Sequence, residues 1–139
     1  MKKPLLFSIL LLAFASGALA QKAHVARIGS AERTSLMNAI RAYDVKRNAE
    51  LADEKFQVSA LLVQGSWAYA NVEQQLPSGA DSYGQAHVFL QKAGGKWKVE
   101  FSTYNASNEV GVDGLERLRK KNRSFPKGLA DFAMKYLAG

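Results

Sequence analysis

The spacing of apolar residues predicts a helix soon after the start of the globular part of the chain. Four apolar residues recur on one face of a 3.6-residue period: Leu36, Met37, Ile40 and Tyr43. Ser30 stands just before them, and its hydroxyl can cap the first turn of a helix. We therefore expect a helix over residues 31–45.

From Phe56 the apolar period changes to two, which is typical of half-buried strands. Strands are expected over residues 56–63, 67–72, 85–92 and 97–102, and residues 73–84 are expected to form a loop. Gly65 and the pair Gly94-Gly95 predict tight turns, because glycine adopts a positive φ at little cost. Strands joined by short turns pair antiparallel, since parallel pairs need long crossovers. In the last strand, alternation places Trp97, Val99 and Phe101 on one face.

The C-terminal part of the chain predicts two helices. Residues 103–114 are expected to be a polar loop because they contain Gly111 and Gly114. A short helix over residues 115–123 follows, and a last helix after Pro126 carries an apolar stripe that begins at Leu129. The fold class is therefore α+β: an N-terminal helix followed by a four-stranded antiparallel meander and two C-terminal helices. We expect all helices to lie on one face of the sheet.

The first twenty residues differ in composition from the rest. A basic start at Met1-Lys2-Lys3 precedes an apolar run, and Ala18-Leu19-Ala20 ends the segment with small residues. This is the pattern of a secretory signal peptide with cleavage after Ala20. The apolar run is roughly half the ~20 residues that span a bilayer. We expect a signal peptide over residues 1–20, a single α+β domain over 21–139, a periplasmic or secreted location, and no transmembrane anchor after cleavage.

Composition narrows the possible chemistry. The chain has 139 residues, Cys 0, His 2 and a formal net charge of +7, and removal of Lys2 and Lys3 with the signal peptide lowers that charge to +5. Without cysteine there is no disulfide, no thiol nucleophile and no cysteine-held metal. A Gly-x-Ser-x-Gly elbow and a phosphate-binding loop are also absent. We expect no metal, no cofactor and no catalytic residue, and whether the protein is an enzyme stays open, with the balance against it.

Several carboxylates and one histidine remain as candidates for acid–base chemistry. The carboxylates are Asp53-Glu54, Glu100 and the pair Glu109 and Asp113. We interpret Asp53 and Glu54 as solvated loop residues and Glu100 as a cross-strand partner of a lysine. His87 lies mid-strand and could act as a base, although a half-buried structural histidine is the simpler interpretation.

Two further groups of residues could form a binding surface. Six cations fall within eleven residues: Arg117, Arg119, Lys120, Lys121, Arg123 and Lys127. They form either a solvated helix face or a patch that binds an acidic protein or an anionic envelope component. Nucleic acid is not expected as a partner, because the protein is exported and this stretch has no interleaved aromatic residues. The second group is Trp67, Tyr69, His87, Phe89 and Trp97, which form sheet core, or a pocket if helices leave their face open.

A resemblance extends over residues 30–102. The motifs that carry it are Arg33-x-x-Leu36-Met37-x-x-Ile40-Arg41, Phe56-x-Val58, Val63-x-Gly65-x-Trp67-Ala68, Val88-Phe89-Leu90 and Gly94-Gly95-Lys96-Trp97-Lys98-Val99. The sequence resembles a family of small bacterial exported proteins of unassigned function, and it is similar in general look to cystatin-like and NTF2-like folds. An NTF2-like enzyme would place an acid and base pair in the concavity of its sheet, where only His87 offers itself here. The resemblance carries over no catalytic residue.

The function expected from the sequence is that of an exported, non-enzymatic protein that binds an envelope component or a protein partner. The alternative is a small NTF2-like enzyme or ligand carrier that uses a sheet cavity near His87, with a carboxylate such as Glu100. A stability or assembly factor without a small ligand is a third possibility.

Overall fold

A computed structural model of the chain describes residues 21–75, 82–104 and 108–139, and the signal peptide expected over residues 1–20 lies outside these ranges. The fold is α+β. Its elements are β1 (His24–Val25), α1 (Ala31–Arg47), the 3-10 helix η1 (Ala49–Asp53), β2 (Lys55–Gln64), β3 (Trp67–Gln75), β4 (Ser82–Ala93), β5 (Lys96–Ser102), α2 (Asn108–Lys121) and α3 (Lys127–Leu137).

The strands form one antiparallel sheet in the order β1-β2-β3-β4-β5. The antiparallel meander is confirmed for β2 to β5, but the sheet has five strands where four were expected. The additional strand, β1, precedes α1 and pairs only His24 with Val63 and Val25 with Leu62. Two residues are too short a segment for an alternating pattern to reveal.

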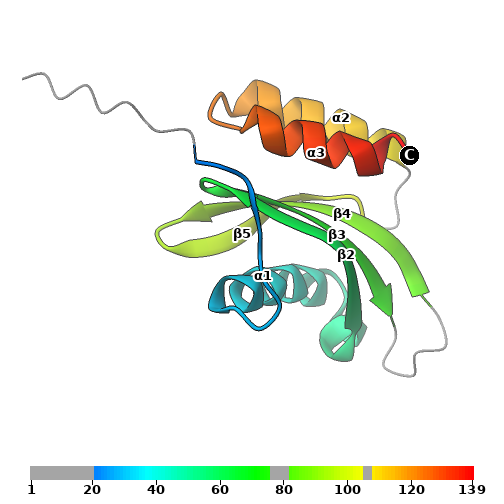
Figure 1. Cartoon of the computed structure of the whole chain (residues 1–139). Helices are drawn as coiled ribbons and strands as arrows, with labels where there is room; N and C mark the ends of the chain where they lie inside the picture. The colour runs from blue at the N-terminus through cyan, green and yellow to red at the C-terminus, as the bar shows by residue number, and fades with distance from the viewer. Residues whose placement is uncertain (1–20, 76–81, 105–107) are drawn as a thin grey trace, which may run out of the picture.

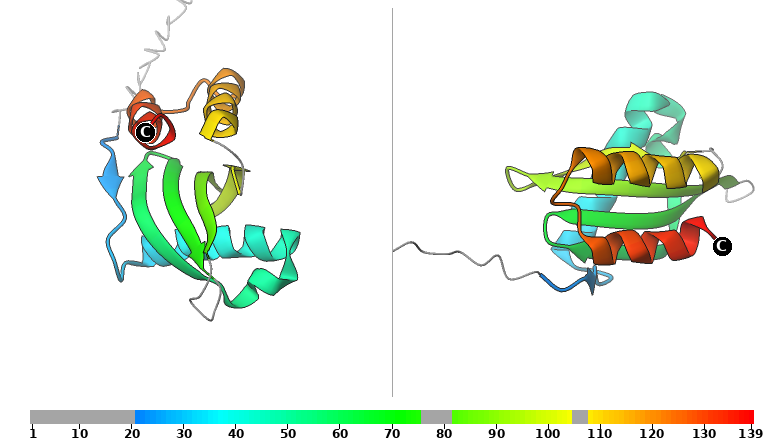
Figure 2. Two further views of the ribbon diagram at one scale, coloured as in Figure 1. Left: turned by 90° about the vertical axis from the view of Figure 1, so that its right-hand side faces the viewer. Right: turned by 90° about the horizontal axis from the view of Figure 1, so that it is seen from above.

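The sheet is covered on both faces, so the expectation that all helices share one face is wrong. In Figures 1 and 2, α1 lies on one side of the sheet and α2 and α3 lie on the other. The reason is that both faces of the strands are apolar: in β2, Leu61 and Val63 pack on the α1 side while Ala60 and Leu62 pack on the α2–α3 side. Each apolar face needs its own cover.

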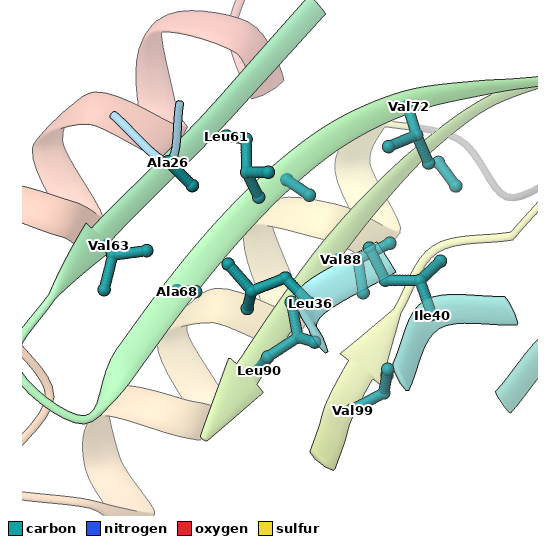
Figure 3. Packing of buried hydrophobic residues seen from close by; sticks show 12 residues of the cluster. Ala26, Leu36, Ile40, Leu61, Val63, Ala68, Val72, Val88, Leu90 and Val99 are labelled. Carbon is teal, nitrogen blue, oxygen red and sulfur yellow. The ribbon is translucent and has the colours of Figure 1, made fainter. Parts of the chain in front are cut away.

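The core on the α1 side is aliphatic. Leu36 and Ile40 of α1 pack onto the aliphatic side chains of the sheet, and Figure 3 shows Leu36 beside Leu90 and Ile40 beside Val88. The predicted cap of α1 is confirmed, because the Ser30 hydroxyl accepts a 3.1 Å hydrogen bond from the Arg33 backbone N–H. Buried aliphatic contacts therefore hold α1 on this face. Replacing one buried leucine by alanine typically lowers the free energy of unfolding by about 2–5 kcal/mol.

The core on the α2–α3 side is aromatic, and glycine lets α2 approach it. The ring of Trp67 lies 4.8 Å from that of Phe125, centre to centre. The expected loop over residues 103–114 is wrong from Asn108 onward, since α2 already begins there. A Cβ at Gly114 would lie 2.2 Å from the Phe101 ring, and one at Gly111 would lie 2.4 Å from the Leu137 side chain. These glycines are sites of close packing within a helix and do not interrupt it.

A β-bulge in β5 places Val99 and Phe101 on opposite faces of the sheet. The register shifts so that Phe101 pairs with Phe89 while Val99 pairs with Leu90. Consequently Val99 packs on the α1 side and Phe101 on the α2–α3 side. The expectation that Trp97, Val99 and Phe101 share a face is wrong at Phe101, because one extra residue reverses the alternation.

The predicted turns are present, and two strands are longer than expected. Gly94 and Gly95 have φ values of 56° and 77°, and Gly65 has 61°. The expected loop over residues 73–84 is wrong at both ends, since β3 continues to Gln75 and β4 starts at Ser82; residues 76–81 lie outside the described ranges. Within those ranges, no helix is both long and apolar enough to cross a bilayer.

Candidate functional site

The five residues considered as a possible pocket are divided between the two faces of the sheet. Trp67, Tyr69 and Phe89 belong to the core beneath α2 and α3, and each is at most 1% exposed. His87 is 2% exposed and lies against the Tyr69 ring. Trp97 packs instead with the α1-side core. The face that carries His87 is thus filled by aromatic side chains and covered by helices.

His87 is held by hydrogen bonds to two neighbouring segments. Its Nδ1 lies 2.8 Å from the Tyr69 hydroxyl. Its backbone N–H donates to the Thr103 hydroxyl at 2.9 Å, and the Thr103 N–H donates back to the His87 carbonyl at 3.0 Å. Burial raises the pKa of the Tyr69 phenol, which keeps that hydroxyl protonated. This arrangement fixes the imidazole within the core.

The carboxylates that the sequence singled out differ in exposure. Asp53, Glu100 and Asp113 are exposed, and the Glu109 side chain lies outside the described part of the structure. Glu54, in contrast, is 3% exposed, so its interpretation as a solvated loop residue is wrong. The exposed Glu100 lines a small cleft with Arg117 and Lys121 of α2.

Glu54 is buried together with a second carboxyl, that of Asp44. Asp44 lies near the end of α1 and is 1% exposed, and Glu54 immediately precedes β2. The side-chain amide of Gln74, near the end of β3, donates to Asp44 Oδ2 at 2.5 Å. Three segments that are distant in sequence thus bring two acids and an amide together.

The two buried acids influence each other's titration. Burial, helped by the hydrogen bond and the negative charge of Asp44, raises the pKa of Glu54 to about 8. Burial also raises the pKa of Asp44, against the lowering effects of Glu54, Gln74 and two nearby arginines. Two such carboxyls cannot both ionise at little cost, so a hydrogen bond between one protonated and one ionised group is the stable arrangement. Both groups are buried, so neither can reach a substrate. Their titration can affect only the stability of the folded protein.

One signal in the sequence pointed to the burial of Asp44. Leu36, Ile40 and Asp44 follow each other at intervals of four, so Asp44 continues the apolar stripe of α1 onto the sheet. A carboxylate on such a stripe requires a buried partner, because burying an isolated charge is very costly. The partner, Glu54, stands in a polar stretch, and its burial could not be read from alternation.

The six predicted cations are all exposed and lie around the end of α2 and the start of α3: Arg117, Arg119, Lys120, Lys121, Arg123 and Lys127. Lys127 pairs with Asp131 at 2.6 Å. Within the described part of the chain, the other five have no carboxylate within 4.0 Å. Arg119, Lys120 and Arg123 also line a shallow cleft of about 570 Å³.

Other parts of the surface add to this charge. The β2–β3, β4–β5 and α2–α3 turns lie at the same end of the molecule in Figures 1 and 2. The β4–β5 turn is flanked by the exposed residues Lys92 and Lys96. We call the six cations near the α2–α3 turn, with Lys92 and Lys96, the basic end.

Among the described residues, no group of three or more acidic or histidine side chains is placed to hold a metal ion. Comparisons with family models, with curated proteins and with solved structures find no match to this chain.

Proposed function

We propose that this protein is an exported, non-enzymatic binding protein of the bacterial envelope, and that its basic end docks on an anionic membrane surface. The observation that carries the proposal is a set of exposed cations, five of them near α2 without carboxylate partners in the described structure, gathered at one end of the fold. Export follows from the three-part pattern of residues 1–20.

The chemistry of the basic end favours a polyanionic surface over a protein partner. Protein interfaces depend on a few buried aromatic or apolar anchors. The large exposed apolar residues of the described structure are Val25, Ile28 and Val110, none of which belongs to the turns that form the basic end. Dispersed lysine and arginine side chains without such anchors suit anionic head groups, where each contributes about 1 kcal/mol of attraction near the surface.

Sedimentation with lipid vesicles tests this docking. The protein without residues 1–20 is mixed with phosphatidylcholine vesicles or with vesicles that also contain phosphatidylglycerol, at low and high salt. We expect binding only to the anionic vesicles and its loss at high salt. The double variant Lys120→Gln/Arg123→Gln should bind about thirtyfold more weakly, because two cations near the surface are lost.

The matched control is Lys55→Gln/Lys135→Gln, which removes the same charge from exposed positions at the start of β2 and the end of α3. Equal losses in the two double variants would show that only net charge matters and would overturn the assignment to the basic end. Retention on an acidic polypeptide without vesicle binding would overturn the choice of a membrane surface.

Export has its own test. The full chain is expressed in a bacterium, and the cell fractions are probed for the protein. We expect it outside the cytoplasm with Gln21 as its first residue. Cytoplasmic protein that retains Met1 would contradict this part of the proposal.

A further inference from the structure

A second surface feature lies on the α1 side of the sheet. It is a groove of about 620 Å³ between α1 and the edge strand β5. Its apolar lining comes from Ala39 and Ala42 of α1 and from Trp97 and Val99 of β5. The volume falls within the range of about 300–1,000 Å³ that is usual for small-molecule sites.

The groove exists because alanines stand where larger side chains would fill it. Ala42 is exposed and Ala39 half-buried, although both lie on the flank of α1 that faces β5. Across from them the Trp97 ring is half-buried, with the Lys92 ammonium 5.7 Å from its centre. An apolar strip that ends in a partly exposed indole is therefore left open between the helix and the strand.

Cations rim this apolar strip. They are Lys46 and Arg47 in the last turn of α1 and Lys98 on β5, and no carboxylate is among the described residues that line the groove. Arg47 is held in place, because its guanidinium donates to the Tyr43 hydroxyl at 2.5 Å and lies 5.1 Å from the centre of that ring. Cations in the last turn of a helix also complement its dipole. That effect does not account for Lys98, which comes from the opposite wall.

We propose that the groove between α1 and β5 binds a fatty acid, with its acyl chain along Ala39, Ala42 and Trp97 and its carboxylate at Arg47. An apolar strip with cations at its rim is complementary to a single apolar chain that carries one anionic head group. The planar guanidinium can bind a carboxylate in a bidentate manner, and Lys46 and Lys98 add unspecific attraction. The volume suits one such chain.

Calorimetric titration of the protein without residues 1–20 tests this assignment, with each amphiphile below its micelle concentration. We expect dodecanoate to bind, and affinity to rise about fourfold for each methylene added from butyrate upward until the groove is full. Dodecyltrimethylammonium, with the same chain and a positive head group, should bind at least tenfold more weakly. Tighter binding of dodecyl phosphate than of dodecanoate would overturn the carboxylate assignment.

Substitutions in the groove locate the binding site. Ala42→Phe adds a ring at an exposed position that lines the groove, and we expect at least a tenfold loss of dodecanoate affinity with unchanged stability. The matched control is Asn38→Phe, which adds the same ring to an exposed position of α1 outside the groove lining. Equal affinities of these two variants would overturn the proposal.

Charge variants separate this site from the basic end. Arg47→Gln should weaken dodecanoate binding about tenfold, whereas Lys120→Gln/Arg123→Gln should leave it unchanged and impair only vesicle binding. Dodecanoate should also shift the fluorescence of Trp97, a change that disappears in Trp97→Phe while the buried Trp67 remains. If the groove instead holds a second copy of the chain, wild type will dimerise in sedimentation and Ala42→Phe will not, which would overturn the fatty-acid assignment.

Discussion

Replacement of Glu54 by glutamine should change how stability depends on pH. Glu54 is buried against Asp44, whose other partner is the amide of Gln74. A glutamine amide has nearly the shape of a protonated carboxyl and can donate to Asp44 in the same way. The variant Glu54→Gln therefore preserves the hydrogen bond of the protonated pair and removes its titration.

The magnitude follows from the pKa of Glu54, which rises from 4.5 to about 8 on folding. Between these values the folded protein keeps a proton that the unfolded chain has released. The stability from this group is fully present below the unfolded pKa and is lost as pH rises through the folded pKa. The free energy of unfolding thus falls by about 1.4 kcal/mol per pH unit, or about 3–4 kcal/mol between pH 5 and pH 8.

Urea unfolding followed by circular dichroism at a series of pH values measures this effect. We expect Glu54→Gln to match the wild type near pH 5 and to exceed it by about 3 kcal/mol at pH 8. Titrating groups that do not interact with Glu54 are common to both proteins and cancel in the difference. The control is Glu50→Gln in η1, which makes the same change on an exposed carboxylate and should not reproduce the gain of Glu54→Gln at pH 8.

A pH-independent difference between Glu54→Gln and wild type would refute the reasoning. It would mean that Glu54 carries the same charge in both folded and unfolded chains, and that Asp44 and Glu54 do not share a proton. A difference that grows toward acid pH would contradict the sign of the pKa shift itself.

Two further substitutions probe the packing beneath α2 and α3. Gly114→Ala should destabilise the protein by about 1–3 kcal/mol in urea unfolding, because its Cβ would overlap the Phe101 ring. In the control, Gly128→Ala, the added Cβ meets only the flexible end of a glutamine side chain, so stability should change by less. Equal effects would show that backbone freedom and not the overlap matters. Tyr69→Phe removes the 2.8 Å hydrogen bond to His87 Nδ1 and should cost about 1–3 kcal/mol by the same measurement, and an unchanged stability would contradict a structural role for that bond.

Local patterns predicted the elements that local physics determines. The cap at Ser30 and the glycine pair Gly94-Gly95 act within a few residues, and both are found where the sequence places them. The apolar stripe of α3 is likewise a property of one segment, and the helix forms over it. For such features the sequence contains all the information that is needed.

Features that depend on contacts between distant segments were not predictable in this way. Gly114 resembles a helix breaker until the Phe101 ring is seen against it. The bulge in β5 turns Phe101 to the opposite face from Val99, although the residues alternate regularly in sequence. The expected loop over residues 103–114 and the expected common face of Val99 and Phe101 were both wrong, because tertiary packing overrides the local rule at these places.

The candidate sites show the same difference between features within one stretch of sequence and features that combine distant segments. The cluster from Arg117 to Lys127 was visible because its six cations fall within eleven residues of sequence, and all six are exposed. The burial of Glu54 was missed because its partner, Asp44, comes from another element. The groove likewise combines α1 with β5, and no stretch of sequence contains both of its walls.

The sheet has one edge at β5 and another along β2, which β1 covers only in part. Different features protect these two edges from pairing with another chain. At β5 the exposed lysines and the bulge make a poor template for a foreign strand. The long edge of β2 is instead partly occupied by β1, and the next residue, Ala26, is buried and donates to the Leu61 carbonyl. Shortening the chain past Ala26 would uncover that edge and make the protein a candidate for strand exchange and aggregation.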